Sequence, residues 1–214
     1  MRFYDVSMDI VTEMAVYKDK DEKRPHFAQT ASFSTHGFQE TRVSLDVHTG
    51  THVDAPLHMV EGGAPIEAIG LERLVTTCRV LNLTHVEDAI AREDLEPFAI
   101  QAGEFLLFQT RNSAREGFDP GFVFLNESGA KYLAEIGIAG VGIDALGIER
   151  SQEGHPTHKA LFSANVVILE GLRLGAVPPA HYLMVCAPLR LKGVDAAPAR
   201  VLLFDLSAPA DAGA

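Results

Sequence analysis

The chain has 214 residues, of which 47% are hydrophobic and 22% charged, and this composition predicts a single globular domain spanning residues 1–214. The formal net charge of −11 argues against nucleic acids and anionic membrane surfaces as partners, because proteins that bind phosphates carry clustered Lys and Arg. The sequence has no apolar stretch near the ~20 residues of a membrane span and no basic and apolar N-terminal signal, so we expect a cytoplasmic protein.

Short apolar runs separated by turns predict a chain rich in strands. In chain order these runs cover residues 3–7, 44–48, 78–83, 105–110, 140–143, 166–170, 182–187 and 199–206. A short helix is predicted at residues 92–96, where Pro97 ends it. A longer helix is predicted at residues 126–136, with Asn126 as its cap and Gly137 as its end. Together these elements predict an α/β domain with a mixed sheet and flanking helices.

The segment at residues 16–25 is a mixed run of charges, which usually forms a solvated loop. Tyr17 and Phe27 lie near its two ends and could help it form a lid. We therefore treat both aromatic side chains as possible contacts to a substrate.

Three histidines and an aspartate fall within residues 48–58, which read HTGTHVDAPLH. They are His48, His52, Asp54 and His58. Imidazole and carboxylate groups suit zinc, manganese or iron. All four positions are even-numbered, so a straight strand would point them to one face but spread them over roughly 30 Å, too far for one ion. The chain must therefore bend, which Gly50 allows at little steric cost.

Two other interpretations fit this segment less well. His48 and His52 stand four residues apart, as in helical zinc motifs, but Gly50 and Pro56 are poor helix formers and favour an extended chain. A single histidine on an apolar face is more often a hydrogen-bonded core residue than a ligand. Four such groups together favour a metal site.

A second group of candidate ligands lies about a hundred residues downstream. His155 and His158 precede an apolar run at residues 166–172 that contains Glu170. A buried carboxylate at a strand end is costly unless it is paired or bound to a cation, so Glu170 is a candidate ligand. The simpler alternative is a strand-end glutamate that meets solvent. His155 could support a ligand, contact a substrate, or be an exposed loop residue.

The segment at residues 48–58, together with His158 and residues 168–172, resembles the metal-dependent hydrolases of the cyclase family. That family includes bacterial kynurenine formamidase and isatin hydrolase. The resemblance extends over most of the chain. It implies a swivelling β/β/α fold, a homodimer or homotetramer, and one or two zinc or manganese ions per subunit.

The resemblance also implies a role for each residue of the motifs. The ligands would be His48, His52 and Asp54 at one site, and Asp54, His158 and Glu170 at a second site that Asp54 bridges. His58 would be the catalytic acid and base beside them. Independently of the resemblance, His58 lies across Pro56 from Asp54 and is the histidine best placed to stay off the metal.

This set of residues predicts hydrolysis. A divalent ion lowers the pKa of bound water from about 15.7 toward 7 and polarises a carbonyl. An unliganded histidine can take the proton of the water and return it to a leaving nitrogen. We therefore expect a metal-dependent amidohydrolase for a small-molecule substrate. The resemblance to the cyclase family implies, first of all, an arylformamidase that converts N-formyl-L-kynurenine to L-kynurenine and formate in tryptophan catabolism. The alternatives are an isatin-type cyclic amide or another carbonyl substrate and, in a different class, a non-catalytic metal-binding module.

The choice of substrate is less constrained. An aromatic substrate needs an apolar or aromatic pocket, and the chain has 12 Phe, 4 Tyr and no Trp. Kynurenine formamidases of the family tend to present a tryptophan near the N-terminal substrate loop, so its absence argues against the formamidase assignment. Arg111, after the strand predicted at residues 105–110, could hold a substrate carboxylate or form a surface or subunit ion pair.

The two cysteines give no support to covalent catalysis. Cys78 and Cys186 lie in separate apolar, strand-like runs, so we expect buried free thiols in a reducing cytoplasm. Neither has a local catalytic signature, and the sequence contains no GxSxG nucleophile motif.

Overall fold

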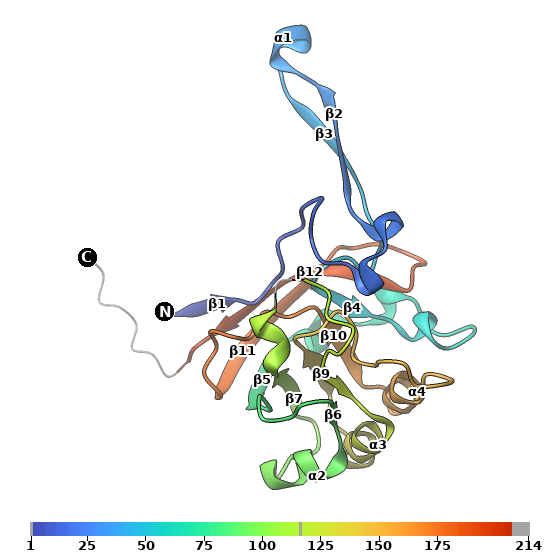
Figure 1. Cartoon of the computed structure of the whole chain (residues 1–214), viewed down its shortest axis with the longest axis vertical. Helices are drawn as coiled ribbons and strands as arrows, with labels where there is room; N and C mark the ends of the chain where they lie inside the picture. Colours follow the sequence, from blue (N-terminus) through green and yellow to red (C-terminus); the bar gives the residue numbers. More distant parts are fainter. Residues whose placement is uncertain (1, 116, 207–214) are drawn as a thin grey trace.

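The computed structural model describes residues 2–115 and 117–206, and its centre is a mixed sheet that closes on itself (Figure 1). The strand order is β1-β12-β11-β5-β7-β9-β10-β4, and β12 also pairs with β4, which gives a barrel-like arrangement. The strands are β1 Phe3–Asp5, β4 His52–Asp54, β5 Val75–Asn82, β7 Phe105–Gln109, β9 Gly140–Ile143, β10 Val167–Glu170, β11 His181–Pro188 and β12 Ala196–Phe204. β5, β7, β9 and β10 pair in parallel, and the other pairs are antiparallel.

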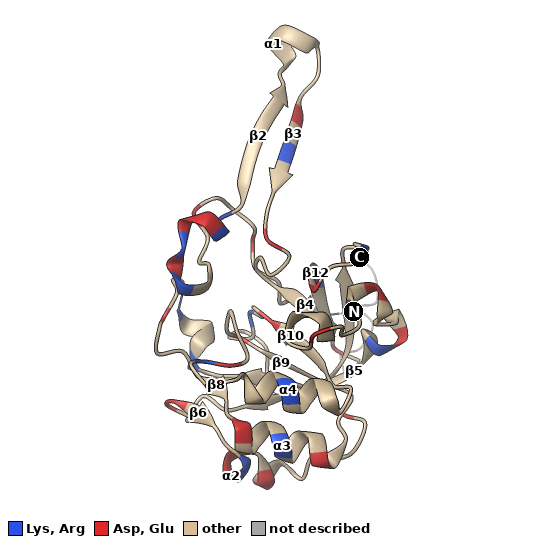
Figure 2. Cartoon of the chain, turned by 90° about the vertical axis from the view of Figure 1, so that its right-hand side faces the viewer, with Lys and Arg blue, Asp and Glu red and all other residues tan. Residues whose placement is uncertain are grey.

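Three α-helices lie together beside the sheet (Figures 1 and 2). They are α2 Arg92–Leu95, α3 Glu127–Ile136 and α4 Pro156–Ser163. The prediction for the longest helix is confirmed, since the Asn126 side chain accepts a hydrogen bond from Gly129 N at 3.0 Å and Gly137 ends the helix at φ 78°. Short 3-10 helices complete the chain at Tyr17–Asp19, Asp21–Lys23, Pro56–His58, Ile66–Ala68, Leu71–Arg73, Glu96–Phe98 and Arg111–Ala114.

Alternation along the strands divides the apolar residues between two cores. Phe105 and Leu107 of β7 point into the barrel. Leu106 and Phe108 point to the opposite face, where they pack with residues of α3 and α4. This is the period-two pattern of a sheet that is buried on both faces, and it explains why β7 reads as a continuous apolar run. A further small pair, β6 Ala89–Ile90 with β8 Phe124–Leu125, adjoins the helix-side core.

A two-stranded arm projects from the body in both views (Figures 1 and 2). It consists of β2 His26–Ala31, the single turn α1 Phe33–His36 and β3 Glu40–Ser44. Its exposed apolar side chains include Phe33 and Phe38, with 71% and 52% of their surface accessible. The sequence does not predict this hairpin, because its strands are almost wholly exposed and have no buried face that would impose an apolar alternation.

Two of the local predictions need correction, and one helix is an addition to them. The strand predicted at residues 44–48 is wrong: β3 ends at Ser44, and a turn follows in which Thr49 N donates to Asp46 O at 3.1 Å. The helix at residues 92–96 is shorter by one residue, and Pro97 lies inside the 3-10 helix that continues it. The helix α4 was not predicted at all. Among the described residues, no helix is both long and apolar enough to cross a membrane.

Candidate metal centre

Two paired strands bring the central residues of the site together. In the antiparallel pair of β4 and β10, His52 lies opposite Glu170, and Val53 lies opposite Leu169. Val53 and Leu169 point into the barrel core. Because side chains alternate, His52, Asp54 and Glu170 share the other face of the sheet. All three are buried, with 0%, 0% and 4% of their surface accessible.

His48 and His58 approach from the chain on either side of β4. The predicted bend is present, since Gly50 adopts φ 64° between His48 and His52. His58 lies in the 3-10 helix that Pro56 begins. The rings of His48 and His58 lie 4.1 Å apart between centroids, and His48 Nδ1 is 3.0 Å from Asp54 Oδ1.

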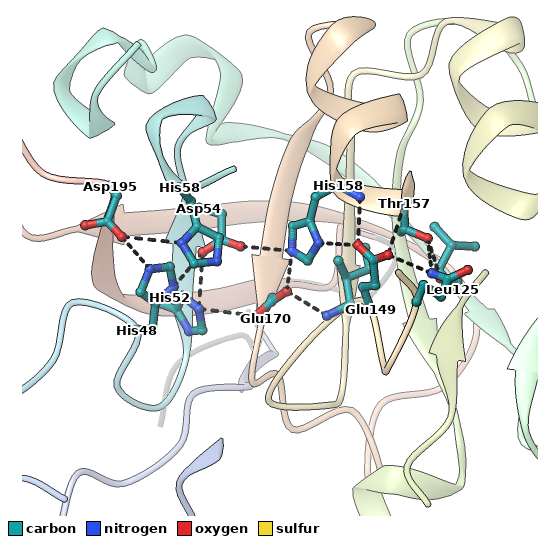
Figure 3. A network of polar contacts seen from close by, with 12 residues as sticks. His48, His52, Asp54, His58, Leu125, Glu149, Thr157, His158, Glu170 and Asp195 are labelled. Atoms are coloured by element: carbon teal, nitrogen blue, oxygen red, sulfur yellow. Dashed lines mark hydrogen bonds and ion pairs between the residues drawn. The ribbon is translucent and has the colours of Figure 1, made fainter. Parts of the chain in front are cut away.

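The fifth predicted ligand comes from α4. His158 lies near the beginning of this helix and points toward the two carboxylates. Its Nε2 is 3.7 Å from Asp54 Oδ2 and 3.5 Å from Glu170 Oε1 (Figure 3). The structure therefore brings together all five residues that the sequence singled out as ligands. Asp54 lies at the centre of the group, where it faces His48, His52 and His158.

The donor atoms of this cluster fit a divalent cation. Among the described residues, both carboxylate oxygens of Asp54 and Nε2 of His52 are buried without a hydrogen-bond partner. Such atoms are costly unless a cation satisfies them. Ligand atoms within 4.8 Å of one another are offered by His52, Asp54 and Glu170, and by His48, Asp54 and His58. Nitrogen and carboxylate donors without thiolate are typical of catalytic zinc and manganese sites.

The outer nitrogens of the three histidines are also held, as is usual for metal ligands. His52 Nδ1 lies 2.9 Å from Gly50 O, and the ring N–H donates to that carbonyl. His158 Nδ1 lies 2.6 Å from Glu149 Oε2. His48 Nε2 lies 2.9 Å from Asp195 Oδ2. Each contact turns the opposite ring nitrogen toward the acidic centre.

The pKa shifts within the cluster show that its carboxylates favour positive charge on the neighbouring groups. Burial opposes a charge on His52, but the carboxylates of Asp54 and Glu170 outweigh it and raise the pKa of His52 from 6.5 to about 10. His158 has a raised pKa for the same reason. Burial would raise the pKa of Asp54, yet the surrounding histidines hold it well below its usual value. His58 differs, because burial lowers its pKa and favours the neutral ring.

Sequence reasoning missed Glu149 and Asp195. Glu149 is 5% exposed and follows the buried Ile148, whose backbone N donates to Glu170 Oε1 at 2.6 Å. Its signal in the sequence is weak, because the apolar residues 145–148 precede it but Arg150 follows it directly. Asp195 is separated from His48 by 147 positions and has no local signal. Only the pairing of β4 with β12, where Ala196 lies opposite Asp54, places it beside the cluster.

A cavity of about 220 Å³ opens onto the cluster. Besides the candidate ligands His48, His158 and Glu170, its lining includes His58 and apolar groups such as Val16, Met59 and Leu146. Two of the predicted substrate contacts, Tyr17 and His155, also line it. Tyr17 is held edge-on by Phe118 and Phe122, at centroid distances of 5.6 and 6.5 Å.

The other two predicted substrate contacts lie elsewhere. As far as residues 2–115 and 117–206 define the cavity, its lining includes neither Phe27 nor Arg111. Phe27 is on the projecting arm. The guanidinium of Arg111 donates to Glu87 O at 3.0 Å and to Gly121 O at 2.7 Å, which ties two loops together. The two carbonyls therefore occupy the guanidinium N–H groups of Arg111 that would otherwise bind a substrate carboxylate.

Comparison with known proteins places the chain in a family. The profile of the Cyclase family matches residues 4–150. The chain belongs to the Cyclase family. Among its relatives, the kynurenine formamidase of Salinibacter ruber (strain DSM 13855 / M31) is 29% identical over 98% of this chain and 100% of its own length. The kynurenine formamidase of Maricaulis maris (strain MCS10) is 32% identical over 78% of this chain and 81% of its own length.

Solved structures of Cyclase-like proteins share the fold. A potential metal-dependent hydrolase with cyclase activity is 56% identical, with a TM-score of 0.89 over 95% of this chain and 98% of the other. Isatin hydrolase A from Labrenzia aggregata, solved with benzyl benzoate, has a TM-score of 0.82 at 23% identity, over 94% and 93% of the two chains. The second likeness shows the fold alone.

Proposed function

We propose that this Cyclase-family chain is a metal-dependent hydrolase of non-peptide C–N bonds, with N-formyl-L-kynurenine as its first candidate substrate. One observation carries the proposal: the fully buried Asp54 carboxylate lacks a hydrogen-bond partner among the described residues, yet faces three histidines. A carboxylate in that position needs a cation. The names of the two curated relatives and of the 56% identical structure support the hydrolase class.

In this proposal the ion is zinc or manganese, and each subunit holds one or two. His48, His52 and Asp54 are the ligands of one position. Asp54 also serves a second position with His158 and Glu170. The distances support shared use of the Asp54 carboxylate, because Oδ1 faces His48 and His52 at 3.0 and 3.3 Å while Oδ2 faces His158 at 3.7 Å.

The bound ion supplies a water of lowered pKa and a polarised carbonyl. The residues of the chain do the rest. His58 is neutral over more of the pH range than an exposed histidine because burial lowers its pKa, so it can accept the proton of the attacking water. It then returns this proton to the leaving nitrogen. Tyr17, Met59 and Leu146 line an apolar wall of the cavity that excludes bulk water from the reaction.

For the substrate, formyl-kynurenine and an isatin-type cyclic amide make different demands. A substrate with an amino acid head group needs a cation and an anion at the cavity. Lys23 and Asp46 line it and carry these charges, but they pair with each other at 3.0 Å, so a head group would have to separate them before it could bind to either. The chain has no tryptophan to stack on either substrate. We therefore keep ring opening of a cyclic amide as the alternative, and we give Tyr17 and His155 the substrate contacts.

The experiment is metal content combined with turnover in one preparation. N-formylkynurenine hydrolysis is measured in purified protein, after chelation, and after return of zinc or manganese. Activity that is lost and recovered with the metal supports the proposal. If the metal binds and this substrate is untouched, isatin and other cyclic amides are tested next. A protein that takes up metal but hydrolyses no amide would be a non-catalytic metal-binding module.

Three broader expectations accompany the proposal. We propose a single domain over residues 1–214 of the swivelling β/β/α type, a cytoplasmic location, and a homodimer or homotetramer. The projecting arm supports self-association, because an isolated two-stranded hairpin is marginal in water and this one exposes Phe33, Phe38 and Val43. Analytical ultracentrifugation that compares the oligomeric state of the wild-type chain with that of Phe33→Ser tests this self-association. A wild type that sediments as a monomer would contradict this expectation.

A further inference from the structure

Asp195 lies at the outer edge of the proposed metal centre, where it contacts the proposed ligand His48 and the proposed acid/base residue His58 (Figure 3). It directly precedes β12, whose first residue, Ala196, lies opposite Asp54 of β4. Its backbone is fixed as well, since Ala55 N donates to Asp195 O at 2.9 Å. The side chain is 40% exposed, so it meets solvent on one side and the cluster on the other. Strand pairing therefore sets where this carboxylate lies.

One oxygen of this carboxylate contacts two histidines. Asp195 Oδ2 lies 2.9 Å from His48 Nε2 and 3.4 Å from His58 Nδ1 (Figure 3). The two rings lie side by side at an interplanar angle of 44°. The contact to His48 is within the ordinary range of a strong hydrogen bond, and the contact to His58 is longer. These contacts link the metal ligand and the acid/base residue through a shared acceptor.

The chemistry of the carboxylate fixes the state of both rings. An ionised carboxylate only accepts hydrogen bonds, so each ring nitrogen that faces it must carry a proton. In a neutral His48 the lone pair is then on Nδ1, the atom that faces Asp54 at 3.0 Å. In a neutral His58 the lone pair is on Nε2. A metal ligand and a general base each need a ring nitrogen with a free lone pair, and these tautomers supply it on Nδ1 of His48 and on Nε2 of His58.

We propose that Asp195 is a positioning residue that sets the tautomer and orientation of His48 and His58 together. This inference rests on the proposed function for the role of His58, while its effect on His48 concerns metal binding alone. Loss of the carboxylate then has two consequences. His48 becomes a poorer ligand, and neutral His58 becomes a mixture of tautomers of which only one has its lone pair on Nε2.

The test compares Asp195→Asn, which keeps the shape, with Asp195→Glu, which keeps the charge. Zinc affinity is measured by competition with a chromogenic chelator. The tautomers of the ring nitrogens are read from long-range ¹⁵N–¹H correlations in the zinc-loaded protein. Turnover of N-formylkynurenine gives kcat and KM at saturating zinc. Asp5→Asn is the control, because Asp5 pairs with the exposed Arg200 away from the cluster.

We expect Asp195→Asn to weaken zinc binding by roughly 10- to 100-fold and to lower kcat by a similar factor at nearly constant KM. We also expect it to produce a mixture of His58 tautomers. Asp195→Glu recovers part of each loss, and Asp5→Asn changes none of them. Zinc affinity and ring tautomers in Asp195→Asn that equal those of wild type would overturn the inference. Wild-type protein that binds zinc but hydrolyses no amide would sink the proposed function, while the affinity and tautomer measurements still decide the role of Asp195.

Discussion

Gly171, next to the proposed metal centre, allows its backbone to pack closely against the backbone of Gly50 and Thr51. Gly171 follows Glu170 with φ 70°, and a Cβ placed there would lie 2.3 Å from Gly50 O and 3.1 Å from Thr51 Cα. A hydrogen bond joins the same two segments, because Thr51 Oγ1 donates to Gly171 O at 2.5 Å. We therefore predict that Gly171→Ala forces apart the two backbone segments that carry His52 and Glu170.

The size of the effect follows from two terms. A side chain in the left-handed region costs about 1–2 kcal/mol. Displacement of well-packed neighbours costs about 1–3 kcal/mol more. The total of about 2–5 kcal/mol corresponds to a fall in Tm of roughly 4–20 °C for a chain of this length. Gly137→Ala is a matched control, because Gly137 has φ 78° but meets nothing within 4 Å, so only the first term applies.

The assay is calorimetric unfolding of both variants together with a zinc titration. Gly171→Ala should lose more stability than Gly137→Ala and should also bind zinc more weakly, since its strain moves His52 relative to Glu170. Gly137→Ala, at the end of α3, should bind zinc as wild type does. Equal losses of stability in the two variants, with unchanged zinc affinity in both, would refute the argument.

Three further predictions concern single groups. His58→Asn should lower kcat by about 10²- to 10⁴-fold in steady-state assays while metal content stays unchanged, and a loss below tenfold would count against its role. In metal-free protein the Tm should fall as the pH rises from 6.5 toward about 10, because folded His52 keeps a proton that the unfolded chain releases. Calorimetry with and without zinc checks this, since the bound ion replaces the proton and should remove the slope. Burial raises the pKa of Cys78 and Cys186 to about 12, so a thiol reagent should label neither before unfolding and both after it, as mass spectrometry can show.

The sequence was most informative where the chemistry is concentrated. The density of ligands from His48 to His58 predicted the cluster, and the need to bend the chain predicted the role of Gly50. Glu170 was recognisable because a carboxylate in an apolar strand has to be compensated. Each of these inferences used residues close in sequence.

Features that depend on long-range pairing could not be predicted in this way. The run at residues 44–48 predicted a strand, but the chain turns after Ser44 so that His48 reaches Asp54. The helix α4 has eight residues and a proline in its first turn, too short for a clear helical period. Asp195 becomes visible only once β12 pairs with β4.

The most direct test of a metal centre at Asp54 is anomalous diffraction from zinc-loaded crystals, recorded on both sides of the zinc absorption edge. We predict a peak about 2.0–2.2 Å from His52 Nε2 and from an Asp54 carboxylate oxygen. A second peak near His158 and Glu170 would show that Asp54 serves two ions. Zinc found only at other residues, or crystals that take up neither zinc nor manganese, would contradict the account.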